Sequence, residues 1–545
     1  MANRKVGTSL LLVVLVSVAA TSASAQSFRV QCPTSTITHP SALNNNNAEP
    51  AYTGPTTLGP AASGGYLVPT AKVNGAIKCQ QISGGDGYAT MGDGTQTYMF
   101  SFGPLSGLLD MSNGQPGTQF PSVFNTVYAA ATPLVPGDPA TTVLASGPGS
   151  FTYNGAVGLD YDRVMGPAVI DGHVDPRQIM DVGVMNGNIP APLMAIDEDD
   201  EYFLTLTNVG MIMRPDLFEQ HTVHFHGYPN ASAFYDGVPD ASVAINIGGS
   251  FTYYYLAPDA GTYFWHCHIT PPEHLQMGMV GQLYVRPRQN RVPVGNNLYT
   301  ALQAQQTDLR TACNSATDIL CSNSLPAVNT GATGGFVVAT ATSTKMYAYN
   351  DGDGSTYYDV EYPLQIHGFD PNFHFVGMTF NPEGFVDMKD KYFLLNGRSY
   401  PDTVAAGAMT TQSADGVKHF SQPLSAIVNI PVGGKALLRI SDLDVTEYQT
   451  LASLGIPMQV VGYNAKLLRD QAGNNMFYNT NSITLAGGES LDVILNASGY
   501  TSGQVFYLYT PNLDHLSNDA ENFGGLMTEV HICTSVNPTT KACTL

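Results

Sequence analysis

Imidazole, thiol and thioether side chains gather in two short stretches of this chain, which hold six of its 13 histidines. The first stretch reads His-Thr-Val-His-Phe-His-Gly over residues 221–227. The second covers residues 266–279 and contains His-Cys-His at 266–268, then His274 and Met279. Soft sulfur together with imidazole selects copper, and two histidines, one cysteine and a weak axial methionine form a blue-copper electron-transfer site. The spacing therefore predicts a copper centre.

The elements that must position these residues are expected to be strands. Abundant Thr and Val, with 29 Tyr, favour strands, and 55 Gly with 35 Pro favour frequent turns. We find no long amphipathic helix pattern, so we expect an all-β chain. Its length of 545 residues predicts two to three domains, each large enough for a sizeable core.

The sequence also bounds the compartment and the partners. Arg4 and Lys5 precede an apolar run over residues 10–20 and then Ala-Ser-Ala at 23–25, which is typical of a secretory signal peptide over residues 1–25. We therefore expect export to the periplasm or the extracellular space, with a bacterial source preferred. No other apolar run is long enough to span a membrane. The net charge of −21 is spread along the chain, which argues against a nucleic-acid partner.

The chain has seven cysteines, so disulfides within the chain must leave at least one of them unpaired. If Cys267 is a metal thiolate, six remain, and in an exported protein these are expected to form three disulfides. Proximity in the sequence favours Cys313–Cys321 and Cys533–Cys543, which leaves Cys32–Cys79, although the sequence alone does not establish this connectivity.

Two strand-rich blocks of the chain resemble each other. Met-Asn-Gly at 185–187 matches Leu-Asn-Gly at 395–397, and Ile-Gly-Gly at 247–249 matches Ala-Gly-Gly at 486–488. Because these features recur in one order, they predict a duplicated β-sandwich unit. The second copy has lost every candidate ligand in this alignment, in which the residues opposite His221, His224 and His226 are Ile456, Gln459 and Val461.

Composition along the chain predicts a domain plan. Stretches rich in Ser, Thr, Asn, Pro and Gly predict loop-like structure, and strand patterns predict the two sandwiches. The plan has an extended N-terminal segment at 26–90, a metal-binding domain at 91–288 with an insertion at about 110–180, a linker at 289–340, a second, metal-free domain at 341–534 and a tail at 535–545.

These motifs resemble the multicopper oxidase branch of the cupredoxin superfamily. The resemblance is carried by His-x-x-His-x-His-Gly, by Asp236-Gly237, and by Gly-Thr-Tyr-Phe-Trp-His-Cys-His with the downstream Gly278-Met279. It covers about residues 190–287, with a fainter likeness to the family's copper-free middle domain over 341–534. It implies two cupredoxin-like Greek-key β-sandwich domains. It also implies an oxidoreductase that passes electrons from a small-molecule or metal-ion donor through copper to O₂.

The resemblance further implies a ligand set. A type 1 copper would be bound by His221, Cys267 and His274 with Met279 in the axial position, for which Met277 competes. A type 2/type 3 copper cluster would take the other histidines of the two stretches, which are His224, His226, His266 and His268. Because neighbouring side chains on a strand point to opposite faces, Cys267 can face one copper centre while the histidines beside it face another.

The sequence departs from the family pattern in two ways. The loop from Cys267 to His274 is two residues longer than usual, although the offset from His274 to Met279 is retained. The domain also supplies only half of the histidines that a trinuclear cluster needs, and the remaining histidines contain no His-x-His pair. A homo-oligomer that places two copies of the domain face to face would complete the cluster. His515 is the best distant candidate for an extra ligand.

Two other functions stay open at this stage. A copper nitrite reductase relative would hold a type 2 copper with three histidines across a subunit interface, but such enzymes carry Asp where His224 stands and lack a histidine where His268 stands. A non-enzymatic blue-copper carrier or copper-binding protein requires about one copper per chain, whereas the oxidase requires more than one. The electron donor is not readable from the sequence, so Cu(I), Fe(II), Mn(II) and phenols all stay open.

Overall fold

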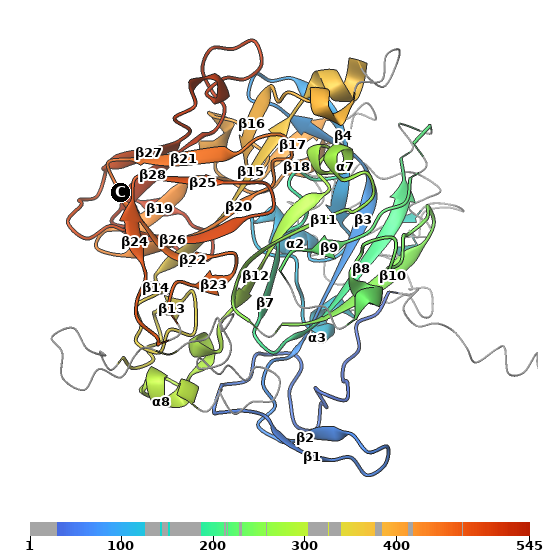
Figure 1. The fold of residues 1–545 in the computed structure, drawn as a ribbon, viewed down its shortest axis with the longest axis vertical. Helices are drawn as coiled ribbons and strands as arrows, with labels where there is room; N and C mark the ends of the chain where they lie inside the picture. Colours follow the sequence, from blue (N-terminus) through green and yellow to red (C-terminus); the bar gives the residue numbers. More distant parts are fainter. Residues whose placement is uncertain are drawn as a thin grey trace, which may run out of the picture.

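The computed structural model contains two β-sandwiches that lie side by side (Figure 1). It describes residues 30–125, 142–143, 151–152 and 187–545, apart from 212–213, 215, 218, 228–231, 258, 304–324, 326–338, 377–383, 413–417 and 471. Strands dominate the regular structure of these residues, which confirms the predicted all-β fold. The predicted signal peptide, the predicted Cys313–Cys321 disulfide and most of the insertion lie outside them.

The first sandwich consists of two four-stranded sheets. One sheet has the order β10-β8-β3-β4, and the other has the order β7-β12-β11-β9. Apolar side chains from both sheets, among them Phe102, Tyr253 and Trp265, belong to one buried cluster. The strands are β3 (Ile77–Thr90), β4 (Gln96–Pro104), β7 (Met194–Asp197), β8 (Glu201–Gly210), β9 (His224–Phe225), β10 (Ser250–Leu256), β11 (Gly261–His266) and β12 (Val280–Arg286).

The second sandwich has a larger sheet with the order β16-β15-β20-β26-β22-β23, where β24 also pairs with β22. Its smaller sheet has the order β19-β28-β27-β21-β25. The strands are β15 (Val360–Phe369), β16 (Tyr392–Leu395), β19 (Val428–Pro431), β20 (Lys435–Asp442), β21 (Gln449–Leu454), β22 (Met458–Tyr463), β23 (Lys466–Leu467), β24 (Tyr478–Thr480), β25 (Ser482–Leu485), β26 (Ser490–Asn496), β27 (Val505–Tyr509) and β28 (Met527–Cys533).

The two sandwiches share one strand plan. In the first, β8 is antiparallel to β10 and parallel to β3, just as β20 is antiparallel to β26 and parallel to β15 in the second. Likewise, β12 is antiparallel to β11 and parallel to β7, as β28 is antiparallel to β27 and parallel to β19. The duplication predicted from weak sequence similarity is therefore present in the strand pairing.

One detail of the predicted alignment is wrong. On the paired strands β9 and β11, His224 stands opposite His266. The corresponding pair on β21 and β27 is Ser453 opposite Leu508, whereas Gln459 lies on β22 in the other sheet. The sequence alignment had no long motif to anchor it in this region, so it matched the wrong strand.

The predicted loop-like N-terminal segment is also wrong for residues 77–90. These residues form β3, which lies between β4 and β8 in the first sheet. Nearly all of β3 is buried on both faces, so the strand lacks the alternation of apolar and polar residues that reveals a half-buried strand. Among the described residues before β3, the regular structure consists of one hairpin, formed by β1 (Thr57–Pro60) and β2 (Leu67–Ala71).

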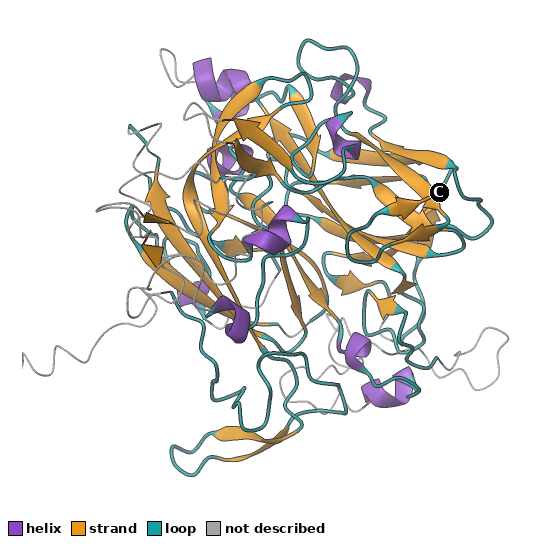
Figure 2. Cartoon of the chain, turned by 180° about the vertical axis from the view of Figure 1, so that it is seen from behind, coloured by secondary structure: helices purple, strands orange, loops and turns teal. Residues whose placement is uncertain are grey.

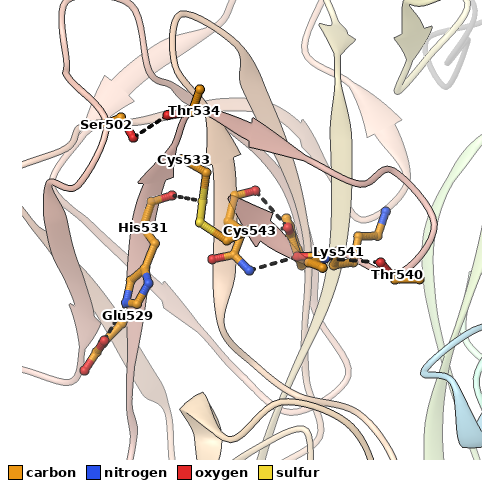
Figure 3. Close-up of a disulfide and its surroundings, with 11 residues drawn as sticks. Ser502, Glu529, His531, Cys533, Thr534, Thr540, Lys541 and Cys543 are labelled. Carbon is orange, nitrogen blue, oxygen red and sulfur yellow. Dashed lines mark hydrogen bonds and ion pairs between the residues drawn. A yellow bond between two sulfur atoms is a disulfide. The ribbon is translucent and has the colours of Figure 1, made fainter. Parts of the chain in front are cut away.

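Two of the predicted disulfides are confirmed. Cys32 is bonded to Cys79 on β3, and Cys533 at the end of β28 is bonded to Cys543. Figure 3 shows the second bridge beside Lys541 and the His531–Glu529 pair.

The remaining elements are short and connect or flank the sheets (Figure 2). The helices are α2 (Leu108–Ser112), α3 (Pro121–Phe124), α7 (Pro271–Gln276) and α8 (Leu298–Gln303), with tighter or wider turns at Ala233–Tyr235, Arg288–Arg291, Asn372–Val376, Phe385–Asp387, Asp402–Val404 and Leu513–His515. The outer hairpins pair β5 (Thr142–Val143) with β6 (Phe151–Thr152), β13 (Met346–Tyr347) with β14 (Tyr357–Tyr358), β17 (Met409–Gln412) with β18 (Lys418–Gln422) and β29 (Ser535–Val536) with β30 (Cys543–Thr544).

The helices bear on two of the sequence predictions, the linker and the absence of a membrane span. Helix α8, at the start of the predicted linker, packs with Tyr52 and Tyr347 in a small buried cluster. Among the described residues, no helix combines the length and the apolar character that a membrane span requires.

The strand that precedes the His-Cys-His motif lies at the junction of the sandwiches. Thr262 on β11 donates its hydroxyl to Asp492 Oδ1 on β26 over 2.7 Å. At the end of β12, Arg286 forms an ion pair with Glu361 on β15 over 2.7 Å. The second sandwich thus packs directly against the sheet that carries the metal motifs.

Candidate metal centre

The three strongest candidate ligands meet although they come from different elements. His221 precedes β9, Cys267 directly follows β11, and His274 lies on α7. Their ligand atoms all lie within 4.8 Å of one another, and all three side chains are fully buried. We name them the sulfur group.

The thiol of Cys267 is the centre of the sulfur group. His274 Nδ1 lies 3.4 Å from Cys267 Sγ, and His221 Nδ1 lies 3.9 Å from it. The backbone N–H of Thr222 also points at this sulfur, over 3.5 Å. A buried sulfur that receives an N–H and faces two imidazole nitrogens has the donor set that copper prefers. The residues present therefore fit a copper ion.

Met279 is joined to two members of the sulfur group by its main chain. Its carbonyl accepts the N–H of Cys267 over 3.0 Å, and its own N–H donates to the carbonyl of His274 over 2.9 Å. The N–H of Met277 donates instead to the carbonyl of Glu273. Both methionine side chains are buried, but only Met279 has its backbone tied to two candidate ligands.

The two imidazoles of the sulfur group have opposite pKa shifts. Burial and the nearby His274 ring lower the pKa of His221 well below its usual value. Burial also disfavours charge on His274, but the Cys267 thiol and the Glu219 carboxylate outweigh it and raise the pKa of His274 to about 10. Glu219 forms a hydrogen bond with His274 Nε2. Because metal ligands must be deprotonated, a metal that binds His274 near neutral pH has to displace its proton.

A second group of imidazoles lies next to the first. The ligand atoms of His224, His226 and His266 all lie within 4.8 Å of one another, and His226 Nε2 is 2.9 Å from His266 Nε2. The ring of His268 lies 5.1 Å from that of His224, between centroids. These four residues, which we name the imidazole group, are the ones predicted for the second copper centre.

Hydrogen bonds to carbonyl groups orient two rings of the imidazole group. His224 Nδ1 lies 2.7 Å from the carbonyl oxygen of Asp236, and His266 Nδ1 lies 2.6 Å from that of Cys267. A carbonyl only accepts, so each Nδ1 carries the proton and each Nε2 keeps its lone pair for a metal. Burial, together with the neighbouring imidazoles, lowers the pKa of His226 to about 4 and that of His266 to about 3. These rings are therefore neutral, as ligands must be.

Strand alternation explains how the two groups share one segment. On β11 and the residue that follows it, His266 faces the imidazole group while Cys267 faces the sulfur group. The pairing of His266 with His224 on β9 brings the two sequence stretches together. The structure thus places two ligand groups on opposite sides of one backbone.

Sequence reasoning missed the residues that support these groups. A Cβ on Gly84 of β3 would lie 2.7 Å from His221 Cδ2, so glycine is needed there for the imidazole to approach the strand. Glu219 and Gln276, which flank the sulfur group, carried no motif. The run of glycines at 84, 85 and 87 was the one available signal, because glycine in a strand marks a close approach.

The other described histidines are engaged elsewhere. His515, the predicted extra ligand, stacks on Phe393 with ring centroids 3.8 Å apart and contacts Gln449 inside the second sandwich, so that prediction is wrong. The remaining rings with described side chains contact Glu201, Gln276 or Glu529, and they are His39, His367, His374 and His531. His173 and the side chain of His419 lie outside the described part of the chain.

A third cluster of possible ligands, Glu49, Asp197 and Asp200, already has a cation of its own. Lys78 Nζ lies 2.8 Å from Glu49, 3.9 Å from Asp197 and 3.8 Å from Asp200. This cluster is therefore an internal ion network.

Comparison with known proteins agrees with this chemistry. A family model described as multicopper oxidase matches residues 169–290. Laccase abr2 of Aspergillus fumigatus is 34% identical over 109 residues, which cover 20% of this chain and 17% of that protein. The copper-containing nitrite reductase of Rhizobium meliloti is 34% identical over 109 residues, which cover 19% of this chain and 26% of that protein. The crystal structure of a blue copper oxidase from Nitrosomonas europaea is 22% identical, with a TM-score of 0.40, over 64% of this chain and 78% of that one.

The two sandwiches and the two ligand groups define a β-sandwich protein whose sulfur and imidazole donors suit copper. The domain that carries both groups is therefore similar to the multicopper oxidase family, whose model covers the residues of both groups. The matched segments span 17% and 26% of the two curated relatives, so the relatives' activities do not transfer to the whole chain by similarity alone.

Proposed function

We propose that this protein is a copper-dependent oxidoreductase of the multicopper oxidase type. The sulfur group and Met279 would hold a type 1 copper, and the imidazole group would hold a type 2/type 3 centre. Copper, when bound, supplies one-electron redox chemistry, so that electrons from a small-molecule or metal-ion donor reach O₂. The chain's own part is to bind and orient the metal and to link the two centres through one backbone.

The observation that carries this proposal is the position of Cys267. Its sulfur faces His274 Nδ1 at 3.4 Å, while the residue before it belongs to a second set of imidazoles. One covalent segment therefore joins a sulfur-containing site for electron transfer to a nitrogen-only site. A carrier with a single copper has no use for the second group.

A homo-oligomer is part of the proposal. Within the described residues the imidazole group contains four histidines, half of what a trinuclear cluster takes. Two copies placed face to face would supply the rest. The oligomeric state of the copper-loaded protein, measured by analytical ultracentrifugation, tests this point, and a strictly monomeric protein with full oxidase activity would contradict it.

Export is also proposed. Two disulfides, Cys32–Cys79 and Cys533–Cys543, suit an oxidising compartment such as the periplasm or the extracellular space. The relatives named above come from both fungi and bacteria, so they do not distinguish a bacterial from a fungal setting.

The deciding experiment is to load the purified protein with copper, count the bound ions and record absorption and EPR spectra. We expect more than one copper per chain, an intense thiolate-to-copper band in the visible, and O₂ consumption with a phenol, Fe(II), Cu(I) or Mn(II). Cys267→Ser should abolish the band while leaving copper on the imidazole group. A wild-type protein that stays colourless would refute the proposal.

A nitrite reductase activity is the second candidate, because three rings of the imidazole group bring their ligand atoms within 4.8 Å and so suit a single type 2 copper. Consumption of nitrite by the copper-loaded protein, without O₂ uptake, would favour it. A lone type 1 EPR signal with one copper per chain would instead indicate a blue-copper carrier.

A further inference from the structure

The loop that carries His274 is fastened to the second sandwich by one buried glutamine. Gln276 is the last residue of α7, two positions after His274, and only 1% of its surface is exposed. Figure 1 shows α7 close to the second sandwich, and its residues contact β15. The helix belongs to the first domain, so this contact crosses between the two domains.

Gln276 uses its side chain and its carbonyl in four polar contacts with the second sandwich. Its Nε2 donates to Asp390 Oδ1 over 2.6 Å, and its Oε1 accepts the N–H of Asp370 over 3.1 Å. The same Oε1 lies 2.9 Å from His374 Nε2, and the backbone carbonyl lies 3.1 Å from His367 Nε2. We name these five residues the glutamine clamp.

The partners of Gln276 are themselves held in place. Asp370 Oδ2 accepts the N–H of Lys389 over 2.7 Å, and Asp390 Oδ2 accepts the hydroxyl of Thr446 over 2.5 Å. The ring of His374 stacks on Phe369 with centroids 5.2 Å apart. Leaving a buried polar group without a hydrogen-bond partner destabilises the folded protein. A network in which every group has a partner therefore favours a single arrangement.

The clamp lies a short distance along the backbone from the candidate copper ligands. His274 faces Cys267 Sγ from the same helix, and the N–H of Gly278 donates to the carbonyl of Leu275 over 2.9 Å. The N–H of Met279 donates to the backbone carbonyl of His274 over 2.9 Å, so a shift at the end of α7 reaches both candidate ligands.

We propose that Gln276 is a positioning residue for the type 1 copper, through which the second sandwich holds His274 and Met279 in their binding geometry. This inference rests on the proposed function, since it assumes copper on the sulfur group. In this inference the second sandwich supports the copper site without supplying a ligand.

The test compares Gln276→Leu with Gln282→Leu in the copper-loaded full chain. Gln282 is a matched control, because it is also fully buried and also crosses the junction, with its Nε2 at 2.9 Å from both the Arg439 carbonyl and Ser441 Oγ. It lies on β12 rather than on the ligand loop. We expect Gln276→Leu to shift the thiolate-to-copper band and the type 1 EPR hyperfine coupling and to weaken copper binding roughly tenfold, whereas Gln282→Leu keeps the wild-type spectrum.

A second variant, made in the second sandwich, guards against the case in which Gln276→Leu fails to fold. His374→Phe retains an aromatic ring against Phe369 and removes the N–H that faces Gln276, so it should shift the same spectral features to a smaller extent. Wild-type spectra in both Gln276→Leu and His374→Phe would overturn the inference, as would equal spectral changes in Gln276→Leu and Gln282→Leu. A wild-type protein without any thiolate band would instead refute the proposed function.

Discussion

At the scale of single residues, the position of each candidate ligand depends on the residues around it. Cys267 and His266 are neighbours in the chain, yet the first faces two imidazoles of the sulfur group and the second faces His226. His221 reaches its place only because a glycine of β3 leaves room for its ring. The ligands were recognisable by type, but their positions depend on residues with no metal chemistry of their own.

Gly84→Ala is expected to weaken copper binding at the sulfur group. The new Cβ would lie 2.7 Å from His221 Cδ2, so the buried ring has to shift. Overpacking of this kind typically costs about 1–3 kcal/mol, and a displaced ligand lowers metal affinity by roughly tenfold. A copper titration followed by the thiolate band measures the effect. Gly384→Ala is the control, since its Cβ would meet no atom nearer than 3.4 Å, and equal affinities in the two variants would contradict the prediction.

At the scale of elements, strand pairing and one short helix assemble the two ligand groups. β9 and β11 pair to align the imidazole group, and α7 returns His274 to Cys267. β3 supports the site from the facing sheet and is tied to the N-terminal segment by the Cys32–Cys79 bridge. Each element carries only part of the site, so the stability of their packing matters for function.

The two described disulfides are expected to contribute unequally to stability. Cys32–Cys79 spans 47 residues, whereas Cys533–Cys543 spans 10. Because closing a longer loop removes more entropy from the unfolded chain, we expect losses of about 4 and about 3 kcal/mol, respectively, when each pair is replaced by alanine. Reversible urea unfolding of the two double variants measures this difference. A larger loss for the shorter loop would show that native packing, rather than chain entropy, dominates.

At the scale of the whole molecule, buried charges join the two sandwiches. Glu361 on β15 pairs with Arg286 of the first sandwich over 2.7 Å and with Arg439 of the second over 3.0 Å. Burial opposes the charge on Glu361, but these two guanidinium groups outweigh it and lower its pKa well below the usual value. The carboxylate is therefore kept ionised at the junction beside the domain that carries the candidate ligands.

Glu361→Gln is expected to destabilise the protein by about 3 kcal/mol near neutral pH, because it takes the carboxylate away from the half-buried Arg286 and the buried Arg439, which keeps only the more distant Asp492. A lowered pKa in the folded state stabilises the protein above the unfolded pKa of about 4.3, and this contribution is lost as the pH falls through the folded value. The difference between wild type and variant should therefore shrink below about pH 4. Urea unfolding over a pH series measures it.

The exposed Lys466–Asp259 pair, with an N···O distance of 3.7 Å, supplies a control for this series. Lys466→Gln should change stability little at any pH, because exposed ion pairs contribute little. A Glu361→Gln effect that does not depend on pH would show that the loss comes from packing alone.

Much of the fold and of the candidate site could be predicted from local patterns. The strand plan of two similar sandwiches was foreseeable because Gly-rich turn motifs recur in one order. The residues of both ligand groups were foreseeable because their types and spacing are unusual for anything but copper. β3 was not foreseeable, since a strand buried on both faces and interrupted by glycines shows no alternation.

The sequence by itself was enough to predict copper, the candidate ligands and the interleaving of the two ligand groups. These depend on side-chain chemistry and on strand alternation, which act between near neighbours. Only the tertiary structure decided that His515 lies away from the site, that β3 makes room for His221, and that Gln276 joins α7 to the second sandwich. Gln276 and Asp390 are 114 positions apart, and a contact at such a distance arises from the packing of one sandwich on another, which no local pattern encodes.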